Sequence, residues 1–235
     1  MIRKYLLSTV VLLCIACSTG FSHALWVETA AFGQKGVTQE IKIYFGEYTT
    51  HDISAPGEWL SDLSEFSLLL ITPDNKEIPL QTKAAKDHYT ATFTPQEEGA
   101  YKVVIHKVAK ELYYGYRLDY NSSAIVQVGA DPVTVSHFNK ISIAPELKNY
   151  RVNDTIHFET FVDASFTGDK EVQVMAPNTW VKTIYPDDAG KANFVPLWPG
   201  KYIVEMIVKA NTKGQHNGAE FTTDFHCATY AIEVK

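Results

Sequence analysis

Short runs of β-branched and aromatic residues recur from Leu25 onward, and residues typical of turns separate them roughly every ten positions. Runs of this length, with apolar side chains in alternation, predict half-buried strands rather than helices. The strands predicted in the first half cover residues 25–31, 39–45, 66–71, 78–81, 88–94, 99–107 and 122–128. Many short strands at such spacing indicate an all-β protein built from antiparallel β-sandwiches.

The strand pattern at the end of the first half recurs in the second half of the chain. Phe93-Thr94-Pro95 leads through a turn into the predicted strand at 99–107, and Asn193-Phe194-Val195-Pro196 leads into another at 200–208. The remaining strands predicted in the second half cover residues 142–144, 155–162, 171–175, 192–196 and 227–234. We therefore predict two immunoglobulin-like or transthyretin-like sandwich domains in tandem, at residues 23–130 and 131–235.

The N-terminal segment has the pattern of a secretory signal peptide. Arg3 and Lys4 precede an apolar run at residues 5–16, which is followed by small and polar residues. The run is shorter than the ~20 residues that a transmembrane helix needs. The sequence therefore predicts an exported, periplasmic protein that does not span the membrane.

Two cleavage positions satisfy the preference of signal peptidase for small residues. The signal peptide covers residues 1–22 if the mature chain begins at His23, or residues 1–24 if it begins at Leu25. The small-residue rule alone slightly favours Leu25. Lipid anchoring at Cys17 is less favoured, because Cys14 stands three residues before it, where such sites prefer Leu.

Cysteine content and charge restrict the mature chain further. Cys14 and Cys17 lie in the signal segment, so Cys227 stands alone and no intrachain disulfide can form. The formal charge of −6 becomes −8 once the two positive charges of Arg3 and Lys4 are removed. An acidic surface repels nucleic acid, which we exclude as a partner.

The sequence contains few motifs that are typical of catalytic or cofactor-binding sites. The sequence has no nucleophile elbow, no HExxH, no phosphate-binding glycine loop and no dinucleotide fingerprint, so we predict a binding protein and not an enzyme. The tyrosines at 113, 114, 116 and 120 could stack against a sugar, although packing at a sheet edge or between domains is the favoured interpretation.

The histidines are the remaining candidates for a functional site. His216 lies in a Gly-rich loop and His226 opens the last predicted strand, so the two could face each other across a hairpin. Imidazole ligands suit nickel, cobalt, copper or zinc, whereas magnesium prefers oxygen ligands.

Glu47 and Cys227 are weaker candidates. Glu47 follows Phe45-Gly46 at the end of a predicted strand, where a glycine lets two backbones approach closely. Cys227 follows His226 on one strand, so the two side chains should point to opposite faces. A buried, apolar Cys227 is favoured over a ligand.

Four segments resemble an uncharacterised family of bacterial periplasmic proteins linked to cobalt and nickel uptake. These segments are His23-Ala24-Leu25-Trp26-Val27-Glu28, Phe45-Gly46-Glu47, Pro199-Gly200-Lys201-Tyr202-Ile203-Val204-Glu205 and Ala228-Thr229-Tyr230. Residues 172–205 are also similar to the carboxypeptidase regulatory-like module, a transthyretin-type sandwich.

The resemblance implies capture of Ni²⁺ or Co²⁺ outside the inner membrane and delivery to a membrane metal transporter. It also implies a histidine at the mature N-terminus, which shifts our preference to cleavage before His23. The expected metal ligands are His23, Glu47, His216 and His226. The alternative is a structural or glycan-binding envelope module with no role in metal binding.

Overall fold

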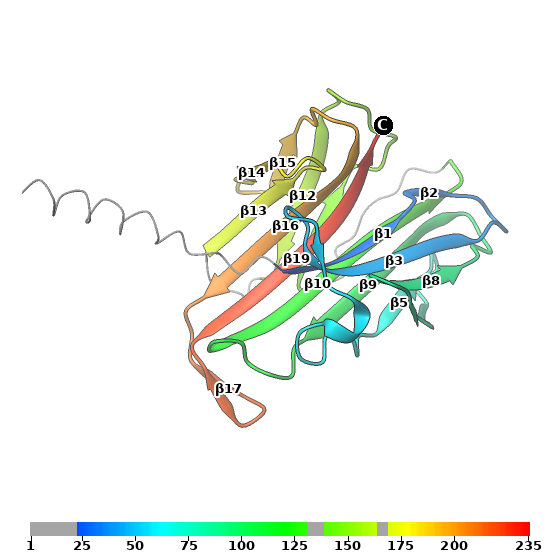
Figure 1. Cartoon of the computed structure of the whole chain (residues 1–235). Helices are drawn as coiled ribbons and strands as arrows, with labels where there is room; N and C mark the ends of the chain where they lie inside the picture. The colour runs from blue at the N-terminus through cyan, green and yellow to red at the C-terminus, as the bar shows by residue number, and fades with distance from the viewer. Residues whose placement is uncertain (1–22, 131–138, 164–168) are drawn as a thin grey trace, which may run out of the picture.

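The structure is a computed structural model that describes residues 23–130, 139–163 and 169–235 (Figure 1). Strands dominate it, and the only helical element in these ranges is a 3-10 turn, η1 (Pro56–Glu58). The prediction of an all-β protein built from antiparallel sandwiches is confirmed. The signal peptide predicted at residues 1–22 lies outside the described ranges. No helix within them is long and apolar enough to cross a membrane.

One antiparallel sheet belongs entirely to the first half. It orders its strands β1 (Ala24–Thr29), β3 (Gln39–Glu47), β8 (Tyr89–Phe93) and β7 (Lys83–Ala84). The short β4 (Asp52–Ile53) pairs with the end of β3. The burial of β3 alternates for most of its length, as expected for a strand with one face on a core.

The largest sheet takes strands from both halves of the chain. Its order is β14 (Val181–Ile184), β13 (Asp169–Met175), β16 (Gly200–Ala210), β19 (Thr223–Val234), β10 (Tyr116–Val128), β9 (Gly99–Val108), β5 (Leu68–Ile71) and β6 (Glu77–Leu80), with β2 (Phe32–Gly33) paired to β10. The halves meet where β10 and β19 lie side by side in parallel, from Tyr116↔Thr223 to Ser123↔Tyr230 (Figure 1). The domain boundary at residue 130 stays a prediction, but the halves share this sheet.

A three-stranded sheet completes the second half. It contains β11 (Ile141–Pro145), β12 (Ile156–Val162) and β15 (Lys191–Phe194), all antiparallel. A small hairpin, β17 (Gly214–His216) and β18 (Ala219–Phe221), extends from the end of the large sheet (Figure 1).

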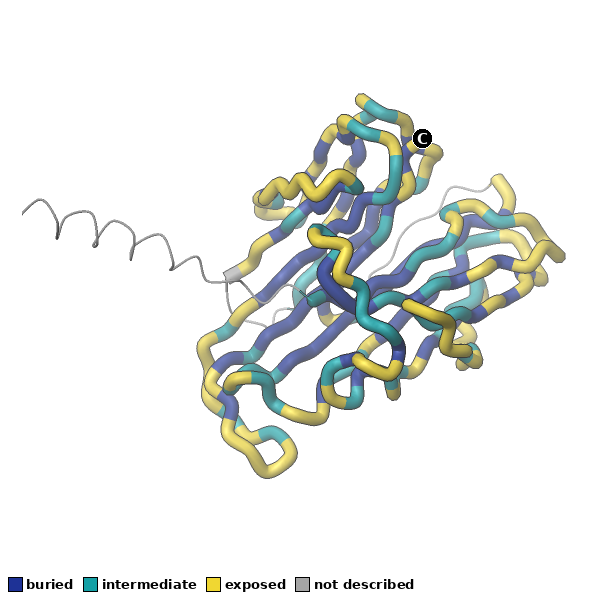
Figure 2. Tube along the Cα trace, viewed as in Figure 1, coloured by how far each residue is buried: buried dark blue, intermediate teal, exposed yellow. Residues whose placement is uncertain are grey.

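Three apolar clusters hold these layers together. The first lies between the large sheet and the sheet that contains β1, β3 and β8, and the second lies between the large sheet and the three-stranded sheet. The third packs Ala24 and Trp26 of β1 against Met175 and Ile203 of the second half. Trp26 is 1% exposed, and complete burial of a large apolar side chain contributes about 1.5–3 kcal/mol. Burial is continuous from Leu118 to Val128 of β10 and from Phe225 to Tyr230 of β19, the two strands that join the halves (Figure 2).

Candidate functional site

The four predicted ligands occupy three separate places. His23 immediately precedes β1, Glu47 ends β3, His216 lies in β17 and His226 lies in β19. The prediction that His216 and His226 face each other across a hairpin is wrong. His216 pairs with Ala219, whereas His226 pairs with Val208 and Asp119.

His216 anchors its hairpin to the rest of the protein. Its Nε2 lies 2.8 Å from the carbonyl oxygen of Ala109, and the Asn217 amide donates to the carbonyl oxygen of Lys110 at 2.9 Å. The imidazole nitrogen that contacts Ala109 acts as a donor there, so its hydrogen bond fixes the hairpin. A metal at this nitrogen would have to displace that contact.

His226 is buried between two carboxylates. It is 1% exposed, with Nδ1 at 3.1 Å from Asp119 and Nε2 at 3.3 Å from Asp224. Burial alone would disfavour its charge, but hydrogen bonds to the two carboxylates outweigh burial and raise the pKa of His226 above 6.5. A protonated imidazole has no free lone pair for a metal. The arrangement favours an ion pair at this histidine.

Asp119 is the centre of this charged network. It is 5% exposed, and one of its oxygens lies 3.0 Å from Nε2 of His106 and accepts from the Asn121 amide at 3.0 Å. Burial would raise the pKa of Asp119, yet the hydrogen bonds from His106 and His226 hold it well below 3.8. Arg117 reaches Asp224 at 2.6 Å and extends the network to the surface. We name these side chains of residues 106, 117, 119, 224 and 226 the seam network.

His23 and Glu47 lie at the same end of the paired strands β1 and β3. Ala24 pairs with Gly46, and continuing this antiparallel register by one residue places His23 opposite Glu47. The His23 ring lies 5.6 Å from the ring of Phe45, which shares a strand face with Glu47. Both side chains therefore face the first apolar cluster, of which Phe45 is a member.

Glu47 is a buried carboxylate with only one oxygen satisfied. The side chain is 7% exposed, and its Oε1 accepts from the Thr49 amide at 3.1 Å and from the Thr49 hydroxyl. Its Oε2 is buried and has no hydrogen-bond partner among the described residues. A buried carboxylate oxygen without a partner is costly, so this atom needs an explanation.

Gly46 permits the close approach that was predicted beside Glu47. A Cβ at this position would lie 2.3 Å from the carbonyl oxygen of Asp52 on β4. We expect Gly46→Ala to lower the free energy of unfolding by more than about 1 kcal/mol, because β3 and β4 must separate. Urea denaturation checks this. Gly57→Ala is the control, since a Cβ there meets nothing within 4 Å, and equal losses for both variants would contradict the expectation.

A second buried carboxylate lies behind Glu47. Glu205 of β16 is 4% exposed and accepts a hydrogen bond from the Cys227 thiol at 3.1 Å. Burial raises the pKa of Glu205 to about 7, and the nearby charge of Glu47 adds to the effect. The hydroxyl of Tyr120, which pairs with Cys227 in the sheet register, is buried without a partner in the described ranges. We name residues 47, 120, 205 and 227 the inner pocket.

The position of Cys227 agrees with the prediction made from the sequence. It is 1% exposed in the first apolar cluster, while His226 points to the opposite face of β19, as alternation predicted. Burial and the adjacent Glu205 raise the pKa of the Cys227 thiol. Sequence reasoning identified Glu47 and Cys227 but missed Glu205, and for Tyr120 it favoured packing over stacking against a sugar. No local pattern distinguishes Glu205 from the apolar residues that surround it.

The donor atoms are not gathered in this structure. Among the described residues, no three His, Cys, Asp or Glu side chains are arranged to hold a metal ion. Neither Glu47 nor Glu205 forms an ion pair with a described basic side chain.

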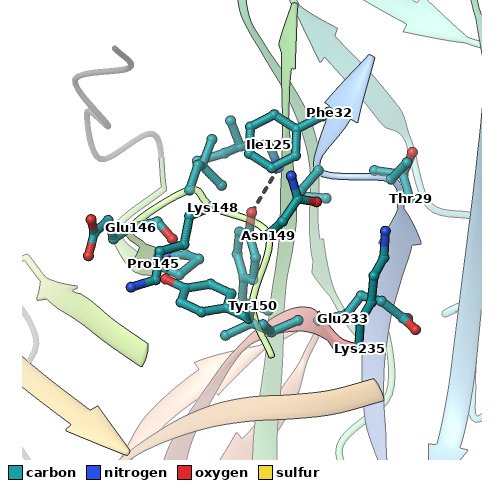
Figure 3. A pocket seen from close by; sticks show the side chains of 17 residues that line it. Thr29, Phe32, Ile125, Pro145, Glu146, Lys148, Asn149, Tyr150, Glu233 and Lys235 are labelled. Atoms are coloured by element: carbon teal, nitrogen blue, oxygen red, sulfur yellow. Dashed lines mark hydrogen bonds between the residues drawn. The ribbon is translucent and has the colours of Figure 1, made fainter. Parts of the chain in front are cut away.

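A cavity of about 300 Å³ lies elsewhere, where β1, β2 and β10 meet the segment after β11 (Figure 3). Phe32, Lys148 and Tyr150 are among its lining residues. Its tyrosine hydroxyls are satisfied: Tyr150 donates to the carbonyl oxygen of Glu146 at 2.5 Å, and Tyr230 accepts from the Ile125 amide at 3.2 Å. None of the predicted ligands lines this cavity.

The predicted tyrosine cluster mostly packs into the protein. Tyr120 belongs to the first apolar cluster, and Tyr113 and Tyr116 pack against it. Tyr114 alone of the four is strongly exposed, at 86%. The interpretation as packing therefore holds for three of these tyrosines.

Comparison with known proteins adds little. No protein-family model matches the chain, and no curated protein matches it. A solved segment of two fibronectin type-III domains from chicken tenascin aligns at a TM-score of 0.25 with 11% identity, over 88% of this chain and 97% of that one. At so low a TM-score the alignment supports no conclusion about function, and the sheets themselves define the fold.

Proposed function

We propose that the chain is an exported, non-enzymatic protein that binds a transition-metal ion such as Ni²⁺ or Co²⁺ through His23 and Glu47. The observation that carries the proposal is the buried, unpartnered Oε2 of Glu47 on the strand face that it shares with the His23 ring. A cation at this oxygen would give it the partner that it lacks.

Cleavage of the signal peptide before His23 would complete the donor set. The new α-amine and the imidazole of His23 can chelate one ion together, and Glu47 would supply a carboxylate oxygen. Two of these three ligands belong to one residue, which is consistent with the absence of a group of three ligand side chains in the described ranges. Nitrogen ligands with one carboxylate suit divalent ions from cobalt to zinc.

The resemblance to periplasmic proteins of cobalt and nickel uptake supports the same function. In that role the chain would hold the ion in the periplasm and pass it to a membrane transporter. His216 and His226 are not part of the proposed site, because their ring nitrogens already have partners. His216 contacts the carbonyl oxygen of Ala109, and His226 contacts the carboxylates of Asp119 and Asp224.

The test begins with the intact mass of the exported protein and continues with calorimetric titration by Ni²⁺ and Co²⁺. We expect a chain that begins at His23. We expect His23→Ala and Glu47→Gln to weaken binding by more than the ~10–100-fold that loss of an outer-shell partner costs.

The control is His51→Ala, which removes an exposed histidine of the loop after β3 and should leave binding unchanged. A chain that begins at Leu25 and binds neither ion would overturn the proposal. The structural or glycan-binding envelope module would then be the better account.

A further inference from the structure

The cavity of about 300 Å³ lies where the two halves of the chain meet (Figure 3). The first half contributes residues of β1, β2 and β10, and the second half contributes the segment at 145–150 and residues of β19. Neither His23 nor Glu47 lines the cavity, so a ligand there would be independent of the proposed metal site. The volume is at the lower end of the ~300–1,000 Å³ that is typical of small-molecule pockets.

The wall of this cavity is mainly apolar and partly aromatic. Phe32, Tyr150 and Tyr230 line it together with aliphatic residues such as Ile125 and Ile232. Phe32 is 39% exposed, so part of its ring remains open to a ligand. Aromatic rings pack favourably against other rings in offset or edge-to-face contacts, and an apolar cavity of roughly 150 Å³ can already bind benzene. The wall therefore suits a single substituted aromatic ring.

The hydroxyl of Tyr230 is satisfied only as an acceptor. It accepts from the Ile125 amide at 3.2 Å, a contact that Figure 3 draws as a dashed line among the side chains that line the cavity. Its own proton has no acceptor among the described residues, although Tyr230 is only 4% exposed. Burial raises the pKa of Tyr230 above its usual value near 10, so the hydroxyl keeps this proton at neutral pH. The cavity thus contains a buried donor that lacks an acceptor.

The side-chain charges around the cavity cancel. Lys148 and Lys235 line it together with Glu146 and Glu233, and all four residues are exposed. A charged ligand would gain little net attraction here while losing its hydration. A sugar fits no better, because the buried residues among the described lining offer only two polar side chains, both tyrosines, and buried hydroxyls without partners are costly.

We infer that this cavity binds a small, uncharged aromatic molecule with one hydrogen-bond acceptor, which accepts from the Tyr230 hydroxyl. The ring of the ligand packs against Phe32 and the apolar wall. Because the cavity is lined by strands of both halves, the ligand contacts both of them and stabilises the folded protein.

The test is calorimetric titration of the exported protein with acetophenone, which has one aromatic ring and one carbonyl acceptor. Benzoate has nearly the same shape but carries a charge, and α-methylstyrene has the same shape without the acceptor oxygen. We expect acetophenone to bind at one site, at least ~10-fold more tightly than benzoate, because burial of an unpaired charge is costly. Equal affinities for acetophenone and benzoate, or no binding of acetophenone, would overturn the inference.

Infrared spectroscopy tests the hydrogen bond in the wild-type protein. A hydrogen bond weakens the C=O bond, so the carbonyl band of bound acetophenone should lie at a lower frequency than its band in hexane. A bound carbonyl that absorbs at the hexane frequency would show that no donor reaches it, and the inference would be wrong.

Two variants locate the ligand. Tyr230→Phe should weaken acetophenone binding by about 2–10-fold, the contribution of one neutral hydrogen bond, and leave α-methylstyrene binding unchanged. This variant also removes the acceptor of the Ile125 amide, so a second variant leaves the core intact. Asn149 lines the cavity, is exposed and has no side-chain hydrogen bond within the described ranges (Figure 3).

Asn149→Trp should fill the cavity and abolish the binding of both neutral probes. The control is Asn193→Trp, which changes an exposed asparagine of β15 that does not line the cavity and should bind as the wild type does. Unchanged acetophenone binding by Asn149→Trp would place the ligand elsewhere and overturn the inference.

Discussion

Replacement of Asp119 by alanine is expected to lower the free energy of unfolding by about 3–5 kcal/mol, since it removes one partner from a buried set of charges. Asp119 accepts hydrogen bonds from His106, Asn121 and His226, and His226 is 1% exposed. Without Asp119, the buried imidazole loses the partner of its Nδ1 in the seam between β10 and β19. Urea denaturation at pH 7 measures the loss.

The control is a second Asp–His pair of the same chemistry at the surface. Asp87 and His88 lie 2.6 Å apart, but Asp87 is 54% exposed. Exposed ion pairs contribute about 0–1 kcal/mol, so Asp87→Ala should cost much less. Similar losses for both variants would show that burial in the seam does not strengthen the interaction.

The pH dependence of the Asp119 effect follows from the pKa shifts of the seam network. The pKa values of His106 and His226 are raised above 6.5, so their stabilisation is complete below about 6.5 and is lost as pH rises through their folded values. The pKa of Asp119 is lowered, so its contribution is present above about 3.8 and is lost as pH falls through its folded value. The difference between wild type and Asp119→Ala should therefore be largest near pH 5–6.

Replacement of Glu205 by glutamine is expected to stabilise the metal-free protein by up to about 3 kcal/mol at pH 8. The pKa of Glu205 is raised from 4.5 to about 7, chiefly by burial, and each pKa unit corresponds to about 1.4 kcal/mol. A raised pKa means that the fold holds the proton more tightly than the unfolded chain, so stability falls as pH rises from 4.5 through 7. Glutamine removes this cost, and its carbonyl oxygen can still accept from Cys227.

Denaturation at two pH values tests the Glu205 prediction. The gain should shrink below about 1 kcal/mol at pH 5, where the folded protein keeps the proton on Glu205. Glu77→Gln on the exposed strand β6 is the control and should change stability by no more than ~0.5 kcal/mol at either pH. A loss of stability at pH 8 would contradict a buried, uncompensated carboxylate at position 205.

Much of the fold could be predicted because strand signals are local. The predicted strand at 99–107 matches β9 (Gly99–Val108), and that at 200–208 begins with β16 (Gly200–Ala210). The prediction missed the first residues of β10 (Tyr116–Val128), because charged residues such as Arg117 and Asp119 do not match the pattern expected of a strand. These side chains are buried or paired with groups distant in sequence, and no local pattern records such partners.

The sequence by itself determined the all-β class, the approximate strand positions, the opposite directions of His226 and Cys227, and the close backbone approach at Gly46. These features depend on the two-residue period of a strand and on the absence of a side chain, which are local properties. Only the tertiary structure decided that β10 and β19 join the halves in parallel, with paired positions that differ by 107 in residue number. The same long-range pairing encloses Glu205 beside Cys227 and His226 between two carboxylates. Burial, and with it the cost of each charge, depends on which strands become neighbours and cannot be predicted from residue type.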